Sequence, residues 1–359
     1  EIGLAEQGTG NLDFLSLNNS QQSITANITV TPTFTNGENS NQGDPINFSI
    51  TVNPTAQVNN VSDIVMSNGT LMGPIDFTTL NTGGTTTYEW TNDNTSIGLT
   101  DSGTESIPEF AGVNEEDVPI NATIEVTPNF EENGITCSGD PINFIITINP
   151  EAQVNEIDDL VYNDGDLVQI PFSSSNSGGT TTYEWTSTDP STGMESSGVG
   201  NIEFIATNTG NSPIVTTVTV IPSFENGGIS NSGNPETFTV TVNPAPQVEL
   251  IQNINICAGD DINDINFSTL NTGGATTYEW TNDNTAIGLA ANGVGDILSF
   301  TATNNTTSAL IATIEVTPTF ENGGTSNTGN PETFTITVNP GAQVDSVADQ
   351  VLCNGELTN

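Results

Sequence analysis

The sequence predicts an all-β chain of tandem immunoglobulin-like (PKD-like) β-sandwich repeats in an extended rod. The first observation is an internal repeat, because Trp90, Trp185 and Trp280 follow one another at intervals of 95 residues, always inside T-T-Y-E-W-T. The second is a two-residue alternation of apolar and polar positions in short runs separated by Gly, Asn, Asp and Pro. About seven such strands in each unit, with one Trp in its first half, are typical of an immunoglobulin-like sandwich.

A recurring motif and a segment match define the length of the repeat. V/I-N-P ends at Pro54, Pro150, Pro244 and Pro340, at spacings of 96, 94 and 96, and residues 81–99 match residues 271–289 at 17 of 19 positions. Self-similarity at a fixed period indicates a repeat architecture. We expect a segment of a longer chain, divided as follows: 1–54, the C-terminal part of a repeat; 55–150, 151–244 and 245–340, three whole repeats; 341–359, the first strand of a further repeat.

The strands of the third repeat can be assigned in chain order. The candidate runs are D-I-N-F-S-T, T-T-Y-E-W-T, I-L-S-F-T-A-T, A-L-I-A-T-I-E-V-T and E-T-F-T-I-T-V-N-P. In the last run Phe334, Ile336 and Val338 lie on one face, as a period of two requires. E-N-G-G at 225–228 and 321–324, with E-E-N-G at 131–134, predicts a hairpin turn between the last two strands, because Asn-Gly tolerates positive φ.

The predicted linkers are short. Each V-N-P passes directly into x-A/P-Q-V and the next strand, with no Gly/Ser run that would act as a flexible hinge. Proline fixes its own φ and restricts the residue before it. We therefore expect a semi-rigid rod in which each repeat contacts its neighbours in the chain.

The charge of the chain is entirely of one sign. It has 44 acidic residues and no Lys, Arg or His, so it contains no side-chain salt bridge. Phosphate clamping by basic side chains is excluded, which makes nucleic acid a poor partner. No stretch approaches the ~20 apolar residues of a membrane-spanning helix. An anionic surface of this kind favours solubility and attracts multivalent cations.

The motif string resembles a known family over essentially the whole chain. T-Y-E-W-T-N-D-N-T-x-I-G-L, A-T-I-E-V-T-P-T-F-E-N-G-G and P-E-T-F-T-I-T-V-N-P are similar to repeats of the SprB-like giant gliding-motility surface adhesins of Bacteroidetes (flavobacteria). The resemblance implies export by the type IX secretion system, display as an outer-membrane-associated filament on the bacterial surface, and movement by gliding machinery. The W-x-F-G-D-G loop usual in PKD domains is replaced by T-N-D-N or T-S-T-D, so no binding role follows from other PKD domains.

The aromatic residues of T-T-Y-E-W-T have two interpretations. The three tryptophans could serve as stacking platforms for sugars, or they could hold the two sheets of each sandwich together. Their recurrence in every whole repeat at a strand centre favours the core. Tyr88, Tyr183 and Tyr278 lie two residues earlier on the same face, so we expect them in the core as well.

The three cysteines occupy two sites that are 26 residues apart across V-N-P. The first site holds Cys137 in one repeat and Asn in the others; the second holds Cys257 and Cys353, or Ser67 and Asn163. A pair that filled both sites could connect neighbouring repeats. Because each cysteine faces an Asn in this reading, we expect three free thiols that act as small buried residues. A catalytic cysteine is excluded, since no His is present to activate it.

Carboxylates after the junctions are candidate metal ligands. Clustered oxygen ligands on turns suit Ca²⁺, which takes six to eight of them. The alternative is a solvated acidic surface with diffuse counterions, because no EF-hand or RTX motif is present. The Ca²⁺ candidates are Asp164, Asp166, Asp260, Asp261 and Asp264; Glu356 and the group Glu151, Glu156, Asp158 and Asp159 lie in similar positions.

The repetition favours a mechanical function over catalysis. An enzyme needs one special cleft, whereas these copies are near duplicates, so we expect no enzyme, no catalytic residues and no resident cofactor other than Ca²⁺. The favoured hypothesis is a set of stalk repeats of a secreted adhesin, which extend an adhesive tip and transmit force. The alternative is a carbohydrate-binding array in which each repeat contacts surface polysaccharide directly.

Overall fold

The computed structural model describes residues 2–357, and it confirms an all-β fold of immunoglobulin-like sandwiches. Helical structure in this range is confined to three single turns of 3-10 helix, η1 (Thr95–Ile97), η2 (Pro190–Thr192) and η3 (Thr285–Ile287). An Asn or Asp side chain accepts a hydrogen bond from the backbone at the start of each turn, and a glycine with positive φ ends it.

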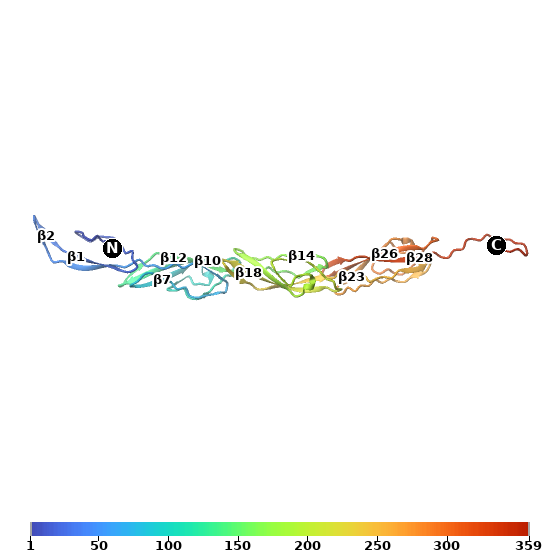
Figure 1. The fold of residues 1–359 in the computed structure, drawn as a ribbon, viewed down its shortest axis with the longest axis horizontal. Coiled ribbons are helices and arrows are strands. Elements are labelled where there is room, and N and C mark those ends of the chain that lie inside the picture. Colours follow the sequence, from blue (N-terminus) through green and yellow to red (C-terminus); the bar gives the residue numbers. More distant parts are fainter. Residues whose placement is uncertain (1, 358–359) are drawn as a thin grey trace. The chain divides into compact units, whose positions relative to one another are not determined.

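The first repeat forms two sheets, and Figure 1 labels β7, β10 and β12 of the larger one. Its strands are β5 (Ile64–Ser67), β6 (Leu71–Met72), β7 (Thr85–Asn92), β8 (Ser102–Thr104), β9 (Phe110–Ala111), β10 (Ile120–Glu132), β11 (Ile135–Ser138) and β12 (Ile142–Asn149). The six-stranded sheet has the order β5-β12-β10-β7-β8, with β11 paired to β10, and β6 pairs with β9. The short β5 runs parallel to β12, whereas the other pairs are antiparallel.

The later repeats contain the same elements. The second has β13 (Leu160–Asn163), β14 (Leu167–Ile170), β15 (Thr180–Ser187), β16 (Ser197–Val199), β17 (Ile202–Ile205), β18 (Ile214–Asn226), β19 (Ile229–Ser232) and β20 (Glu236–Asn243). The third has β21 (Ile254–Cys257), β22 (Asp261–Ile262), β23 (Ala275–Asn282), β24 (Asn292–Val294), β25 (Phe300–Thr301), β26 (Leu310–Asn322), β27 (Thr325–Thr328) and β28 (Glu332–Asn339). In the third repeat the sheet order β21-β28-β26-β23-β24 reproduces that of the first.

Residues 2–54 form two hairpin-like pairs. Strand β1 (Ile24–Val30) pairs with β4 (Ile46–Val52), and β2 (Thr33–Asn36) pairs with β3 (Asn39–Gln42). The chain as a whole divides into two compact units whose boundary passes through the second repeat. Ser173–Tyr183 and Ile221–Pro235 belong to the unit of the first repeat, and Glu184–Val220 belongs to the unit of the third.

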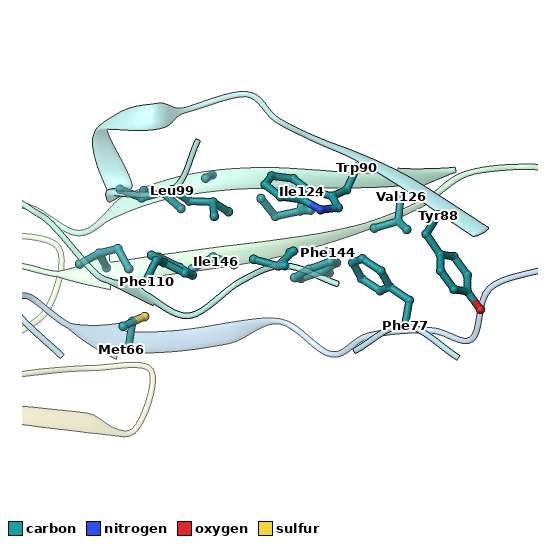
Figure 2. Close-up of a cluster of buried hydrophobic side chains, with 14 residues drawn as sticks. Met66, Phe77, Tyr88, Trp90, Leu99, Phe110, Ile124, Val126, Phe144 and Ile146 are labelled. Carbon is teal, nitrogen blue, oxygen red and sulfur yellow. The ribbon is translucent and has the colours of Figure 1, made fainter. Parts of the chain in front are cut away.

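The core of the first repeat lies between its two sheets. Figure 2 shows Trp90 beside Ile124 and Phe77 beside Tyr88. The ring centroids of Phe77 and Tyr88 are 5.5 Å apart. The alternation expected from the sequence holds along β10, where every second side chain from Ala122 to Phe130 is buried. This burial of apolar area on one face is what stabilises the sheet.

Each tryptophan packs against a glycine on the neighbouring strand. Trp90 is directly opposite Gly103, and a Cβ at Gly103 would lie 2.3 Å from the indole Cζ2. The pairs Trp185–Gly198 and Trp280–Gly293 repeat this arrangement. All three rings are buried and their Nε1 atoms have no hydrogen-bond partner, so the rings present no face for stacking on a sugar.

The predicted hairpin turns are confirmed, but each joins the long strand to an extra short strand. In the first repeat the turn is Asn133-Gly134, with φ of 54° and 77°, and it connects β10 to β11. The partner of β10 changes from β12 to β11 at Pro128, which has no N–H for the ladder. Gly139 donates instead to the Pro128 carbonyl at 3.0 Å. The long strand therefore carries a hairpin tip beyond its pairing with β12.

One expected strand is wrong. D-I-N-F-S-T contributes a single bridge between Ile265 and Ile297, and the strand lies earlier, at β22. Side chains satisfy the backbone here: Asp264 accepts from Ser299 N at 2.7 Å, and Phe267 N donates to the side chain of Asp296 at 2.8 Å. Carboxylates that bond locally to the backbone compete with a regular ladder.

The packing of glycine on tryptophan generates a prediction. Gly103→Ala should lower the free energy of unfolding by about 1–3 kcal/mol, because the new methyl group overlaps Trp90. Gly73→Ala in the same repeat is the control, since its Cβ would meet nothing within 4 Å. Urea unfolding followed by circular dichroism measures both, and equal stability of the two variants would contradict the assignment.

A second prediction concerns pH. Hydrogen bonds from Ser191 hold the pKa of Asp189 below its ordinary value of 3.8. A lowered folded-state pKa stabilises the fold above pH 3.8 and ceases to do so as the pH falls through the lowered value. Asp189→Asn, which matches the natural Asn94 and Asn284, should remove this dependence, whereas the exposed Asp76→Asn should leave it. Thermal denaturation between about pH 2 and 6 tests the difference.

Candidate functional site at the repeat junctions

The asparagine of V/I-N-P is the centre of each junction. Asn149 is 0 % exposed, and its Nδ2 donates to the carbonyl oxygens of Asn226 at 3.0 Å and Ile229 at 3.3 Å. Asn226 Nδ2 donates back to Asn149 Oδ1 at 2.9 Å. Asn226 and Ile229 flank the hairpin tip of the following repeat. A neutral side chain thus satisfies a turn in the next domain while it is fully buried.

The same contact recurs at the other junctions. Asn243 is also 0 % exposed; its Nδ2 donates to the backbone carbonyl of Asn322 at 3.3 Å, and Asn322 Nδ2 donates to Asn243 Oδ1 at 2.9 Å. At the first junction Asn53 donates to the carbonyl of Glu132 at 3.1 Å. Glu132 stands where the other repeats have Asn, and the hydroxyl of Ser23 donates to its carboxylate. The hairpin residue is a charged Glu at the first junction and a neutral Asn at the other two.

A glycine at the hairpin tip lets the two repeats approach. Gly227 has φ of 61°, and a Cβ there would lie 2.8 Å from Cγ2 of Val65 in β5 of the preceding repeat. Gly323 meets Val161 at the same distance. Glycine is required at this position for the turn and also for the close approach.

A second asparagine ties the linker to the next repeat. Asn81 of N-T-G-G accepts from Gln57 N at 2.7 Å and donates to the carbonyl of Thr55 at 3.1 Å. The corresponding bonds of Asn176 and Asn271 have lengths between 2.7 and 3.1 Å. The short linker is therefore hydrogen-bonded along its backbone, which removes its freedom to act as a hinge.

The loop that carries this asparagine also touches the preceding repeat. Ser177 N donates to the carbonyl of Asp117 at 3.0 Å, and Thr272 N donates to that of Asn211 at 2.8 Å. A Cβ on Gly178 would lie 2.9 Å from Cδ of Pro119, so the glycine pair of N-S-G-G makes room for the neighbour. Two separate contacts, the hairpin and this loop, hold each junction.

Sequence reasoning missed these asparagines as functional residues. The signal was present, because each one recurs once per repeat, in V/I-N-P or in N-T/S-G-G. The sequence did not show which groups these asparagines contact. The V/I-N-P asparagine bonds to the hairpin of the next repeat, and the N-x-G-G asparagine bonds to the linker.

The expected pairing of the cysteine sites is wrong. Asn163 Nδ2 donates to the carbonyl of Ser326 at 3.2 Å, and β13 packs against β27 of the following repeat. Strand β5, which ends at Ser67, packs likewise against β19. The second cysteine site therefore faces the hairpin strand one repeat later. The thiols were also expected to be buried, but Cys257 and Cys353 are exposed and Cys137 is half-buried.

The candidate calcium ligands of the second repeat bond to nearby backbone. Asp164 accepts from Asn208 N and Asp166 accepts from Asn163 N, both at 2.7 Å. Asp159 accepts from Thr239 N at 2.7 Å, and that backbone bond lowers its pKa. These carboxylates are engaged in shaping turns.

The candidate ligands of the third repeat are similarly placed. Asp261 accepts from the Thr301 hydroxyl and Asp264 from Ser299 N, both at 2.7 Å, while Asp260 accepts from Ala302 N through its backbone carbonyl. Across residues 2–357 no three Asp, Glu or Cys side chains gather in a way that could hold a metal ion. Specific Ca²⁺ binding stays a prediction from the sequence.

The tyrosines differ in burial. Tyr88 is buried, and burial followed by the charge of Glu105 raises its phenol pKa. Tyr183 and Tyr278 are half-buried, and burial raises the pKa of each. All three phenols are therefore neutral at ordinary pH. In the part of the chain that is described, no helix is long and apolar enough to cross a membrane.

Comparisons with known proteins give likenesses to cell-surface ectodomains at low scores. No family model matches the chain, and no curated protein does. The human desmocollin-1 ectodomain is 13 % identical, with a TM-score of 0.34 over 88 % of this chain and 68 % of that one. Drosophila N-cadherin EC1-4 is 12 % identical, with a TM-score of 0.31 over 91 % and 85 %. Human CDH23 EC21-23 is 13 % identical, with a TM-score of 0.38 over 79 % and 100 %. TM-scores this low say nothing about function, so the function is argued below from the residues of this chain.

The buried asparagine generates a prediction for the junction. Asn149→Ala should cost about 1–3 kcal/mol, because it removes the partner of the Asn226 amide and of two carbonyls. Asn143→Ala on the same strand is the control, since Asn143 is exposed. Urea unfolding measures the loss, and hydrogen exchange should quicken at residues 226–229 in the Asn149 variant only. Unchanged exchange there would contradict a role at the junction.

Proposed function

We propose that the chain supplies non-catalytic, load-bearing spacer repeats of an adhesin displayed outside the cell. The observation that carries the proposal is the recurrence of one set of contacts at successive junctions, with the V/I-N-P asparagine on the next hairpin and the N-x-G-G asparagine on the linker. A chain whose repeats only served as independent binding modules would have no need to build the same rigid joint each time.

The arrangement of the terminal strands suits a chain under tension. The short strand near the start of a repeat, β5, is parallel to the last strand, β12, with Ile64 opposite Ile146 and Ser67 opposite Asn149. Force applied through the linkers pulls these two strands in opposite directions along their length. Their hydrogen bonds are then loaded together in shear rather than opened one after another. The same pairing occurs as β13–β20 and β21–β28.

The charge of the surface supports an exposed, solvated segment. With 44 acidic residues and no basic ones, neighbouring chains repel one another, which opposes lateral aggregation. The sequence resemblance makes the proposal more specific: the repeats belong to a gliding adhesin on a bacterial surface. They are then exported by type IX secretion, moved by the gliding machinery, and hold a tip that contacts polysaccharide or another substratum.

Small-angle X-ray scattering at two salt concentrations tests the stalk. If bonded junctions keep the repeats extended, the radius of gyration should stay the same between about 0.01 M and 1 M NaCl, although the Debye length falls from about 30 to 3 Å. If repulsion alone extends the chain, the radius should shrink markedly at high salt.

The matched variant for this experiment replaces both buried junction asparagines, as Asn149→Ala with Asn243→Ala. It should become salt-sensitive, because its junctions bend more freely. A compact particle at low salt, or a radius in the parent chain that falls as much as in this variant, would contradict the stalk function.

A further inference from the structure

Two structural requirements meet at the hairpin of the second junction. The hairpin residue must carry an amide, because Asn226 Nδ2 donates to Asn149 Oδ1 at 2.9 Å. The residue after it must be glycine, because a Cβ on Gly227 would lie 2.8 Å from Cγ2 of Val65 in the preceding repeat. Together the two requirements place Asn directly before Gly. The third junction has the same pair with its own partners, which are Asn322 and Gly323 with Asn243 and Val161.

Asparagine before glycine is prone to deamidation, because glycine has no side chain that hinders attack by its own backbone nitrogen. In the first step Gly227 N forms a bond to Asn226 Cγ and the Cγ–Nδ2 bond breaks. Ammonia leaves with the proton that the backbone nitrogen gives up, and a five-membered imide remains. One water then opens the ring at either of its two carbonyl carbons. The product is aspartate or isoaspartate, and water is the one further reactant.

The closed junction opposes this reaction. Asn226 is the last residue of β18 and lies opposite Ile229, so the backbone at the point of attack is held in the hairpin. The attack requires Asn226 Cγ to turn onto the nitrogen of Gly227. The side chain must therefore leave Asn149, which holds the amide nitrogen that has to depart. Opening of the junction releases both constraints.

The product of the reaction does not fit the closed junction. Asn149 Nδ2 already donates to the carbonyls of Asn226 and Ile229, and Asn149 Oδ1 faces the hairpin side chain. A carboxylate at position 226 has no hydrogen to donate, so two acceptors would face each other. Turning the Asn149 amide over would only place its oxygen against the two carbonyls. A buried polar atom without a partner is costly, so the product favours an open junction.

The first junction shows what accompanies an acid at this position. Glu132 is the hairpin residue there, and the hydroxyl of Ser23 lies within hydrogen-bond distance of both its carboxylate and Asn53 Oδ1. The position of Ser23 is held by Pro119 and Pro213 at the two later junctions. The proline side chain has no donor. The acid thus occurs together with a donor, and the donor is replaced where the hairpin residue is Asn.

We propose that the Asn226–Gly227 and Asn322–Gly323 pairs are deamidation sites that the closed junction protects. An open junction exposes the amide to attack by the backbone, and the carboxylate that forms keeps the junction from closing again. Each of the two junctions therefore changes irreversibly after it has been open. The inference goes beyond the stalk function, because it follows from the junction contacts whether or not the array bears load.

Incubation of the full chain in mildly alkaline buffer tests the protection. Deamidation of Asn226 should be at least about fivefold faster in Asn149→Ala than in the parent chain, because loss of the buried partner raises the open population by such a factor. Asn322 in the same variant is the internal control, since its partner Asn243 is intact. Asn243→Ala should give the reverse result.

Peptide mass spectrometry measures the two sites separately. Cleavage after Glu225 and Glu236 releases the first site, and cleavage after Glu321 and Glu332 releases the second. Each deamidated asparagine gains about one mass unit, and fragmentation locates it within the peptide. Equal rates at Asn226 in the parent and in Asn149→Ala would overturn the proposal. Faster reaction at both sites in a single variant would also overturn it, because the protection would then not be local.

The effect of the product is tested with Asn226→Asp. Hydrogen exchange should quicken at residues 226–229 and stay unchanged at residues 322–325, and Asn322→Asp should show the opposite. Exchange at the parent rate around the substituted residue in both variants would overturn the proposal, because the junction would then accept the acid. Scattering from the parent chain before incubation reports on the stalk independently, so failure of one proposal is distinguishable from failure of the other.

Discussion

The structure depends on holding β-sandwiches together without a single side-chain cation. Carboxylates cannot be paired with Lys, Arg or His in this chain, so ordered polar contacts use neutral amides, hydroxyls and the backbone. Asparagine is the residue best suited to this, because its side chain both donates and accepts. Buried Asn149 and Asn243 use both capacities at the junctions. Contacts of this kind carry no net charge, so they are insensitive to the salt that screens the acidic surface.

Core and junction are built on the same strand. The buried half of β26, around Ile314 and Val316, belongs to the core, while its far end carries Asn322 to the preceding repeat. The change of partner strand at the proline that recurs in each repeat, Pro318 in β26, is what frees this far end. A repeat that loses its core therefore also loses the hairpin that satisfies its neighbour's asparagine. Stability in such an array is a sum of repeat and interface terms, and here the two are linked through one element.

The repeat length, the hairpin turns and the buried positions of the long strands could be predicted from the sequence, because each depends on local pattern. Asn-Gly and Gly-Gly pairs set the turn, and period two sets the buried face of β10. The prediction failed where a segment alternated like a strand but its backbone groups formed hydrogen bonds with side chains. D-I-N-F-S-T has the alternation of a strand, yet Asp264 and Asp296 take the backbone donors that a ladder would use. The cysteine sites were paired by their separation in sequence, although Asn163 meets residues of the following hairpin.

The sequence by itself determined that this chain is a series of near-identical β-sandwiches with an all-anionic surface, because repetition, alternation and charge are properties of the residues alone. Only the tertiary structure decided which groups face one another at a junction. The asparagine of V/I-N-P is hydrogen-bonded to Asn226 or Asn322, nearly 80 residues later in the chain, and its role at the junction follows from that bond. A motif marks where a repeat ends, but its partner is set by how the hairpin folds back, which depends on contacts far apart in the chain.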